Sequence, residues 1–140
     1  MSPVRLIALL WMAAVVTTAV AAPAPGPTLR QMLAGRQHPY LAAGDIAREH
    51  DVLAQLYAAR DHAPLWIDGV RATPQALGLL HALETAHARG LRDEDYEADT
   101  IAARLGELRS SAAQARFDLA LSVAAVRFLS DLHYGRATPQ

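Results

Sequence analysis

The chain has 140 residues, of which 52% are hydrophobic and 19% are charged, a composition typical of one globular domain. Its 13 basic and 14 acidic residues almost cancel, and the net charge of −1 gives no reason to expect a nucleic acid or an anionic membrane surface as partner. Every basic residue is an arginine and cysteine is absent, which excludes a Schiff-base lysine, a disulfide framework, a thiolate metal site and a cysteine nucleophile within these residues.

Residues 1–21 are expected to be a secretory signal peptide. Arg5 supplies the positive charge, an apolar run covers residues 6–16, and the small residues Ala19-Val20-Ala21 follow. This order predicts cleavage after Ala21, because a cut one residue later would leave Pro23 at the first mature position. The alternative is an uncleaved membrane anchor, for which the apolar stretch is short.

Residues 22–44 are expected to form a spacer and a weakly structured lead-in. The stretch APAPGPT, residues 22–28, is rich in Pro and Gly and offers little surface for packing. The stretch LRQMLAG that follows allows one or two helical turns ending at Gly35. The folded domain is therefore predicted to cover residues 45–140.

The first predicted helix covers residues 45–61. Asp45 can accept hydrogen bonds from the N–H groups of its first turn, and Pro64 requires an end before it. Its apolar face is predicted to consist of Val52, Leu53, Leu56 and Tyr57.

A short extended or hairpin-like loop is predicted over residues 63–72, APLWIDGVRA. Asp68-Gly69 stands between apolar triplets, and glycine accepts the positive φ of a tight turn. We expect Trp66 in this loop to fold back onto the helices.

Two further helices are predicted over residues 73–90 and 91–108. In the first, Thr73 is the expected cap, Pro74 occupies the first helical position, and Gly90 is the left-handed exit. Its buried face is predicted to consist of Ala76, Leu77, Leu79, Leu80 and Leu83. In the second, Asp93 is the expected cap, and the predicted buried residues are Ile101, Leu105 and Leu108.

The longest predicted helix covers residues 110–135 and is apolar on nearly every side, which is typical of a helix surrounded by others. Arg116, Asp118 and Arg127 interrupt it too often for a membrane span. The fold class predicted is therefore all-α: a small bundle of about four helices with a Trp-containing loop. Gly135 is expected to end the last helix, and Pro139 to prevent its continuation.

The histidines offer a weak metal hypothesis. His81, Glu84 and His87 form H-x-x-E-x-x-H, but steps of three residues spread them over roughly 120° of a helix, which strains a common ion. We interpret them as structural or surface residues, with metal binding through His81 and Glu84 as the alternative. No metal or cofactor is expected.

Polar residues of the longest helix raise a second question. Asp118 and Ser122 lie one turn apart, and a buried carboxylate is costly unless it is paired. Asp118 is interpreted as a polar staple that binds an Arg, a backbone end or the Trp66 N–H, with an acid or base as the alternative. The aromatic residues Tyr57, Trp66 and Tyr96 could line a sugar-binding face, but core packing is favoured. No catalytic residue is assigned.

Three stretches form a pattern: LYAARDHAPLWIDG (56–69), LLHALETAHARGLRDEDY (79–96) and FDLALSVAAVRFLSDLHYGRATP (117–139). A Leu-Tyr helix leads into a Pro-x-Trp loop, a leucine-rich helix ends in Ala-x-x-x-Gly-Leu before an Asp-Tyr, and a long helix with an Asp closes with Gly-Arg and a Pro. Their order and spacing resemble the all-helical scaffold domain of periplasmic murein L,D-transpeptidases. The matching positions are Leu56, Tyr57, Pro64, Trp66, Ala86, Gly90, Leu91, Asp95, Tyr96, Asp118, Gly135, Arg136 and Pro139.

The resemblance implies a non-catalytic scaffold domain of a peptidoglycan cross-linking enzyme in the periplasm. Full-length members carry a peptidoglycan-binding module and a catalytic domain with a cysteine in a Ser-His-Gly-Cys context. Because this chain has no cysteine, it is predicted to be a truncated form that is inactive alone, whose partners are the missing domains. The alternative is a stand-alone periplasmic module that binds a cell-wall enzyme or glycan. Neither reading includes a nucleic acid, or a membrane span after leader cleavage.

Overall fold

The computed structural model describes residues 23–135, so the predicted signal peptide at 1–21 and the predicted block at Pro139 lie outside the described residues. Within this range the chain forms five α-helices, one two-stranded hairpin and three short 3₁₀ turns, which confirms a mostly helical fold. The helices are α1 (Gly26–Gly35), α2 (His50–Ala58), α3 (Pro74–Glu84), α4 (Ala98–Ala102) and α5 (Ser111–Tyr134). The strands are β1 (Ile67–Asp68) and β2 (Arg71–Ala72), and the 3₁₀ turns are Ala86–Arg89, Asp93–Tyr96 and Leu105–Glu107.

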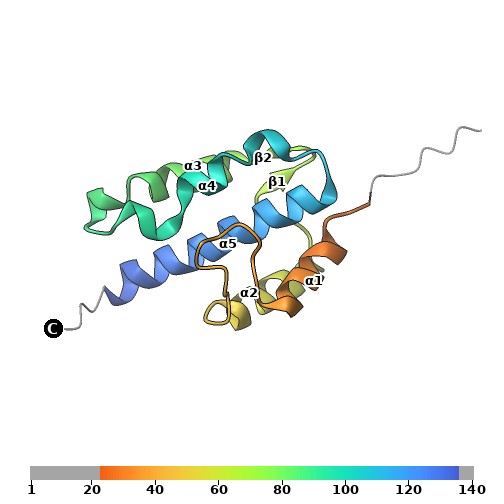
Figure 1. Cartoon of the computed structure of the whole chain (residues 1–140), viewed down its shortest axis with the longest axis horizontal. Helices are drawn as coiled ribbons and strands as arrows, with labels where there is room; N and C mark the ends of the chain where they lie inside the picture. Colours follow the sequence, from red (N-terminus) through yellow and green to blue (C-terminus); the bar gives the residue numbers. More distant parts are fainter. Residues whose placement is uncertain (1–22, 136–140) are drawn as a thin grey trace, which may run out of the picture.

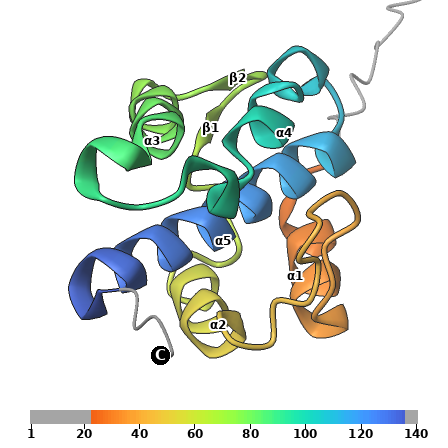
Figure 2. The same ribbon diagram turned by 60° about the vertical axis from the view of Figure 1, so that its left-hand side comes forward.

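Helix α5 is the centre of the fold, as its apolar sequence predicts. It runs between α1 and α2 on one side and α3, α4 and the hairpin on the other (Figures 1 and 2). Ser110 caps its start, since the Ser110 Oγ accepts from the Ala113 N–H at 3.1 Å. Its buried residues are Ala115, Phe117, Asp118, Leu119, Ala120, Leu121, Ser122, Val123, Ala124 and Phe128. No helix in residues 23–135 is long and apolar enough to span a membrane.

Helix α1 ends at Gly35, as the sequence allowed for one or two helical turns, and it is longer than expected within the lead-in at residues 22–44. Proline in its first turn starts the helix, where a missing N–H costs nothing. Leu29 and Leu33, one turn apart, are both buried, and α1 packs against α5. The Pro/Gly-rich composition did not indicate this helix, because its two leucines are buried only by contact with α5, which is distant in sequence.

The loop between α1 and α2 is folded back on itself. The Gln37 and Asp45 backbones form an antiparallel bridge, and the His38 N–H donates to the Gly44 carbonyl at 2.8 Å. A side chain at Gly44 would place its Cβ 2.8 Å from the His38 carbonyl oxygen, so only glycine fits here without a shift. This loop also adds Leu41 and Ile46 to the core.

The predicted helix at 45–61 is shorter than expected. Asp45 Oδ1 accepts from the Ala47 N–H at 2.9 Å, so it stabilises a local turn, and the helix itself begins at His50. Leu53 and Tyr57 are buried as predicted, whereas Val52 and Leu56 are exposed. The prediction of a four-residue apolar face was wrong because α2 contacts the rest of the molecule along a narrow strip.

The Trp-containing loop has the predicted form. Strands β1 and β2 pair antiparallel around Gly69, whose φ of 60° is in the left-handed region. The Thr73 N–H donates to the Trp66 carbonyl at 2.8 Å and closes the hairpin. The next helix begins directly after it, with the Thr73 Oγ1 capping the Ala76 N–H at 3.1 Å.

The predicted helices at 73–90 and 91–108 are both interrupted. Helix α3 ends at Glu84 and continues as a 3₁₀ turn to the predicted left-handed exit at Gly90. On its predicted face Ala76, Leu80 and Leu83 are buried, but Leu77 is exposed.

The region 91–108 is not one helix, because Glu97 has a φ of 54°, which separates a 3₁₀ turn from α4. Asp93 does not cap this region; its side chain accepts from the His87 N–H at 2.7 Å. Ile101 and Leu108 are nevertheless buried as predicted.

His38 is a buried residue that the sequence did not mark. Its Nε2 lies 2.8 Å from the Arg116 carbonyl oxygen on α5, and its ring contacts that of Tyr40 edge-on. Burial lowers the pKa of His38 from 6.5 to about 4, aided by the nearby Arg116 and Arg127 charges and opposed by the hydrogen bond to the Arg116 carbonyl. Neutral imidazole is therefore the form that holds the α1–α2 loop on α5.

The buried imidazole predicts a loss of stability in mild acid. Between pH 6.5 and 4 the unfolded chain binds a proton at His38 and the folded protein does not, so the free energy of unfolding falls as the pH is lowered through this window. The loss from this residue is expected to be roughly 3 kcal/mol. Urea unfolding at several pH values measures it. His38→Gln should remove this part of the pH dependence, and the exposed His81→Gln should not; equal slopes for the two would contradict the assignment.

Candidate functional site

Three separate segments meet at the buried carboxylate of Asp118. Its Oδ1 accepts from the Tyr57 hydroxyl at 2.6 Å and from the Leu65 N–H at 3.0 Å. Its Oδ2 accepts from the Trp66 N–H at 2.7 Å. Asp118 thereby connects α5 to the end of α2 and to the chain entering the hairpin.

Ser122, one turn further along α5, completes this network. Its Oγ accepts from the Trp66 indole Nε1–H at 2.8 Å and lies 2.7 Å from the Tyr57 hydroxyl oxygen. Because the Tyr57 proton is directed to Asp118, the Ser122 hydroxyl donates to Tyr57. The residues Tyr57, Trp66, Asp118 and Ser122, hereafter the Asp118 network, are therefore joined in one set of hydrogen bonds.

The electrostatics of the network fit an ionised carboxylate. Burial raises the pKa of Asp118, and the hydrogen bonds from Tyr57, Leu65 and Trp66 oppose this rise. Burial and the neighbouring Asp118 charge raise the pKa of Tyr57, so its hydroxyl keeps the proton that it donates. Both oxygens of Asp118 act only as acceptors, which is the pattern of the charged form. Among residues 23–135 no cation forms an ion pair with Asp118, so hydrogen-bond donors surround its charge, and the charge of Arg60 lowers its pKa from further away.

The path of the chain between α2 and the hairpin places the Leu65 and Trp66 N–H groups beside Asp118. After Ala58 the backbone turns through Asp61 and His62, both with positive φ, and the His62 N–H donates to the Tyr57 carbonyl at 2.7 Å. Pro64 then holds the chain extended, so that the next two N–H groups point at Asp118. The sharp turn after α2 thus places Leu65 and Trp66 beside a side chain more than fifty residues further on.

The geometry of the network is that of a structural contact. Neither a histidine nor a second carboxylate contacts Asp118 or Ser122 among the interactions described. In the described part of the chain, the hydrogen-bond partners of Ser122 are the Tyr57 hydroxyl and the Trp66 indole, and neither is a base that could activate a nucleophile. The polar-staple interpretation of Asp118 is confirmed, with the Trp66 backbone N–H as partner and the indole bound to Ser122. Tyr57 and Tyr96 are buried, as the core interpretation predicts, and Trp66 is half-buried.

A second set of contacts gathers around Arg127, which the sequence marked only as an interruption of an apolar helix. Its Nε donates to Glu49 Oε1 at 3.1 Å, and its Nη2 donates to the carbonyl oxygens of Ala43 and Asp45 at 3.0 and 3.4 Å. Glu97 Oε2 lies 3.9 Å from its Nη1. Arg127 therefore binds the α1–α2 loop, the start of α2 and the start of α4 to α5. An arginine among the apolar residues 119–128 is the signal that could have indicated this.

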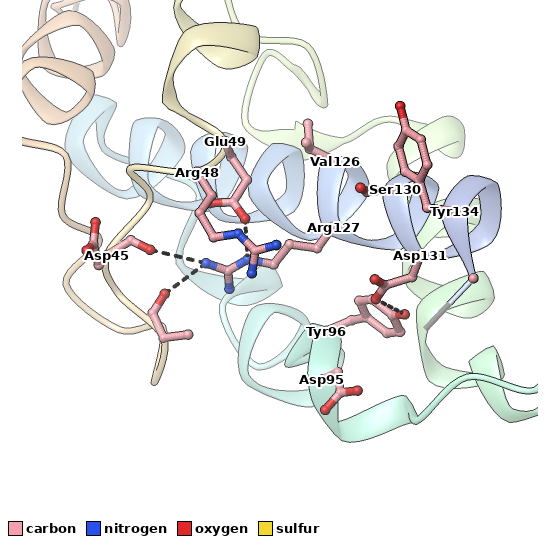
Figure 3. Close-up of a pocket in the computed structure, with 12 residues that line it drawn as sticks. Asp45, Arg48, Glu49, Asp95, Tyr96, Val126, Arg127, Ser130, Asp131 and Tyr134 are labelled. Carbon is pink, nitrogen blue, oxygen red and sulfur yellow. Dashed lines mark hydrogen bonds and ion pairs between the residues drawn. The ribbon is translucent and has the colours of Figure 1, made fainter. Parts of the chain in front are cut away.

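A polar groove of about 710 Å³ lies beside Arg127 (Figure 3). Its walls come from the α1–α2 loop, the start of α2, the 3₁₀ turn ending at Tyr96 and the last turns of α5. The Tyr96 hydroxyl donates to Asp131 Oδ2 at 2.8 Å across its floor, and the Tyr96 ring packs edge-on against Phe128. The Asp-Tyr motif thus contributes to packing the end of α5.

The predicted H-x-x-E-x-x-H residues do not converge. His81 and Glu84 are exposed on α3, whereas His87 lies in the following 3₁₀ turn and its Nδ1 is 2.6 Å from Asp93 Oδ2. Within residues 23–135 no three His, Asp or Glu side chains are grouped to hold a metal ion. Helix α3 ends at Glu84, so His87 does not continue the helical spacing on which the motif depends.

A family model described as the Scaffold domain matches residues 51–140. This range begins in α2 and includes all four residues of the Asp118 network. Searches of curated proteins and of solved structures gave no match.

If the Asp118 network holds the fold, Asp118→Ala should lower the free energy of unfolding by about 3 kcal/mol or more, because it leaves three donors without an acceptor. Asp118→Asn, which replaces one acceptor with a donor, should cost about 1–3 kcal/mol. Denaturant unfolding followed by tryptophan fluorescence measures both. The control is Asp99→Ala on the surface of α4, expected within about 0.5 kcal/mol of the parent. A loss for Asp118→Ala no larger than that of the control would show that the network is not structural.

Proposed function

The chain belongs to the Scaffold domain family, and we propose that it is the non-catalytic helical scaffold of a peptidoglycan L,D-transpeptidase that acts in the periplasm. The observation that carries the proposal is the convergence of the motif residues. Tyr57 and Trp66 belong to the first stretch of the resemblance, and both donate to Asp118, which belongs to the third. The pattern that resembles the transpeptidase scaffold is therefore a pattern of fold-determining contacts, which supports a structural role.

The surface proposed to hold the catalytic domain is the C-terminal end of α5. Leu129, Leu132 and Tyr134 are 62%, 43% and 80% exposed there, on the helix that is otherwise the most buried of the molecule. Apolar side chains gathered at one helix end favour a protein partner. In the proteins that this chain resembles, the Gly-Arg…Pro stretch that follows leads to the rest of the enzyme.

The alternative function is a periplasmic interaction module without any link to cross-linking chemistry. The same apolar end of α5 supports it, since a docking face serves either role. The two proposals differ in the partner: a cysteine-bearing catalytic domain in the first, and peptidoglycan or another wall enzyme in the second.

A reconstitution experiment tests the proposed function. The purified protein alone is expected to form no cross-links between disaccharide tetrapeptides, because it has no cysteine. Calorimetry should show that it binds the separately produced catalytic domain of an L,D-transpeptidase from the same cells. Leu129→Glu with Leu132→Glu should weaken this binding at least about tenfold, the effect of roughly 1.4 kcal/mol.

The matched control is Leu77→Glu, an equally apolar and exposed position on α3. If Leu77→Glu weakens binding as strongly as the double variant does, the C-terminal end of α5 is not the interface. Sedimentation with isolated peptidoglycan, without binding to the catalytic domain, would favour the alternative. Cross-links formed by the chain alone would overturn the non-catalytic assignment.

A further inference from the structure

The segment that follows α1 is closed on itself. The Ile46 N–H donates to the Arg36 carbonyl oxygen at 3.1 Å, so the two ends of the segment meet. The antiparallel bridge and the hydrogen bond from the His38 N–H to a loop carbonyl oxygen both lie inside this closure. Loops whose ends meet in this way form compact units. Residues 36–46, hereafter the closed loop, can therefore move as one body without breaking these backbone hydrogen bonds.

The closed loop is held on the rest of the molecule by side-chain contacts. His38 Nε2 lies 2.8 Å from the Arg116 carbonyl oxygen on α5. The Arg127 Nη2 donates to two carbonyl oxygens of the loop, at 3.0 and 3.4 Å (Figure 3). A carboxylate at the start of α4 accepts from one loop N–H at 2.6 Å, and Leu41 and Ile46 supply the apolar burial. Of these contacts, the one made by His38 depends on the protonation of its imidazole ring.

The docked position of the loop suits only the neutral form of His38. Nε2 faces a carbonyl oxygen and therefore carries the proton, and Nδ1 accepts from the Tyr40 N–H at 3.5 Å. A second proton on Nδ1 would face this N–H group. The charges beside the ring are those of Arg116 and Arg127 on α5, and within residues 23–135 no carboxylate forms an ion pair with it. Burial raises the pKa of Tyr40, whose ring contacts the imidazole, so its hydroxyl stays neutral.

A detached loop removes these restraints on His38. In water the pKa of the imidazole has its ordinary value of 6.5, whereas in the docked loop burial lowers it to about 4. Between these values the detached loop binds a proton that the docked loop does not bind. Lowering the pH through this window therefore favours detachment, and lowering it further adds nothing.

We propose that the closed loop is an acid-released cover of α5, which detaches when His38 is protonated while the rest of the fold stays in place. The Asp118 network has no member in the loop, and α1 keeps its own contact with α5 through Leu29 and Leu33. Ala43 and Asp45 line the polar groove, so detachment opens this groove on one side and frees Arg127 from two carbonyl acceptors. The proposal does not depend on the transpeptidase assignment, because it uses no residue of the proposed docking face.

Thiol labelling tests the proposal, because the chain has no cysteine and one introduced thiol reports on one position. Leu41→Cys places the thiol in the closed loop, and Ala76→Cys places a matched buried thiol on α3. Both are labelled with a disulfide reagent that reacts in acid, and each rate is divided by that of the same variant unfolded in urea at the same pH. The rate at position 41 should rise roughly tenfold between pH 7.5 and 5.5, since detachment takes up one proton over this range.

The dependence on urea separates release of the loop from unfolding of the whole chain. Labelling at position 41 should be the faster of the two and almost insensitive to low urea concentrations, because a local opening exposes little surface. Labelling at position 76 should be slow and should rise steeply with urea. Equal rates with equal urea dependence at the two positions would overturn the proposal, as the loop would then open only with the whole chain.

Histidine variants identify the group that takes up the proton. His38→Gln keeps a donor for the Arg116 carbonyl oxygen but is not protonated in this range, so position 41 should lose its pH dependence in this background. His81→Gln, on the exposed side of α3, should leave the pH dependence unchanged. A rate at position 41 that does not change with pH in the parent, or that changes equally in the two backgrounds, would show that His38 does not control the loop.

Discussion

The fold depends on one buried negative charge that forms no ion pair within residues 23–135. Asp118 is fully buried and is held by a tyrosine hydroxyl and two backbone N–H groups, so its charge is compensated by dipoles that only this chain path supplies. The charge of Asp118 could also be compensated by an arginine, whose long side chain can reach it from several backbone positions. Backbone donors cannot move independently, and the requirement to face Asp118 therefore determines how the chain leaves α2 and enters the hairpin.

A second polar residue of α5 acts with the opposite charge. Arg127 is half-buried and binds two backbone carbonyl oxygens together with the carboxylates of Glu49 and Glu97. Asp118 accepts hydrogen bonds from N–H groups on one side of the molecule, and Arg127 binds acceptors in the α1–α2 loop and at the start of α4. One anion and one cation on the central helix thus determine the positions of the segments packed around it. Its apolar residues make that packing favourable, because they are removed from water.

Features set by neighbouring residues were predictable from the sequence, and features set by distant ones were not. The caps at Thr73 and Ser110, the turn at Gly69 and the helix exit at Gly90 each depend on local chemistry. The sequence predicted Thr73, Gly69 and Gly90 in these roles, but not Ser110. Helix α1 packs against α5, and the Glu97 side chain accepts from the Ala42 N–H, so both features involve segments that are distant in sequence. Asp118 was identified because a carboxylate in an apolar helix is costly; His38 carries no such signal, as its burial is a product of the folded loop.

Helix α1 shows that the hydrophobic core of this chain extends beyond the region that the family model matches. The family match begins at residue 51, yet Leu29, Leu33, Leu41 and Ile46 all lie before it and are all part of the core. A fragment cut at the family boundary would uncover the side of α5 that α1 covers and would lose His38, which fixes the loop to that helix. Relatives that share only the matched region must therefore cover this side of the helix with a different segment or with another protein.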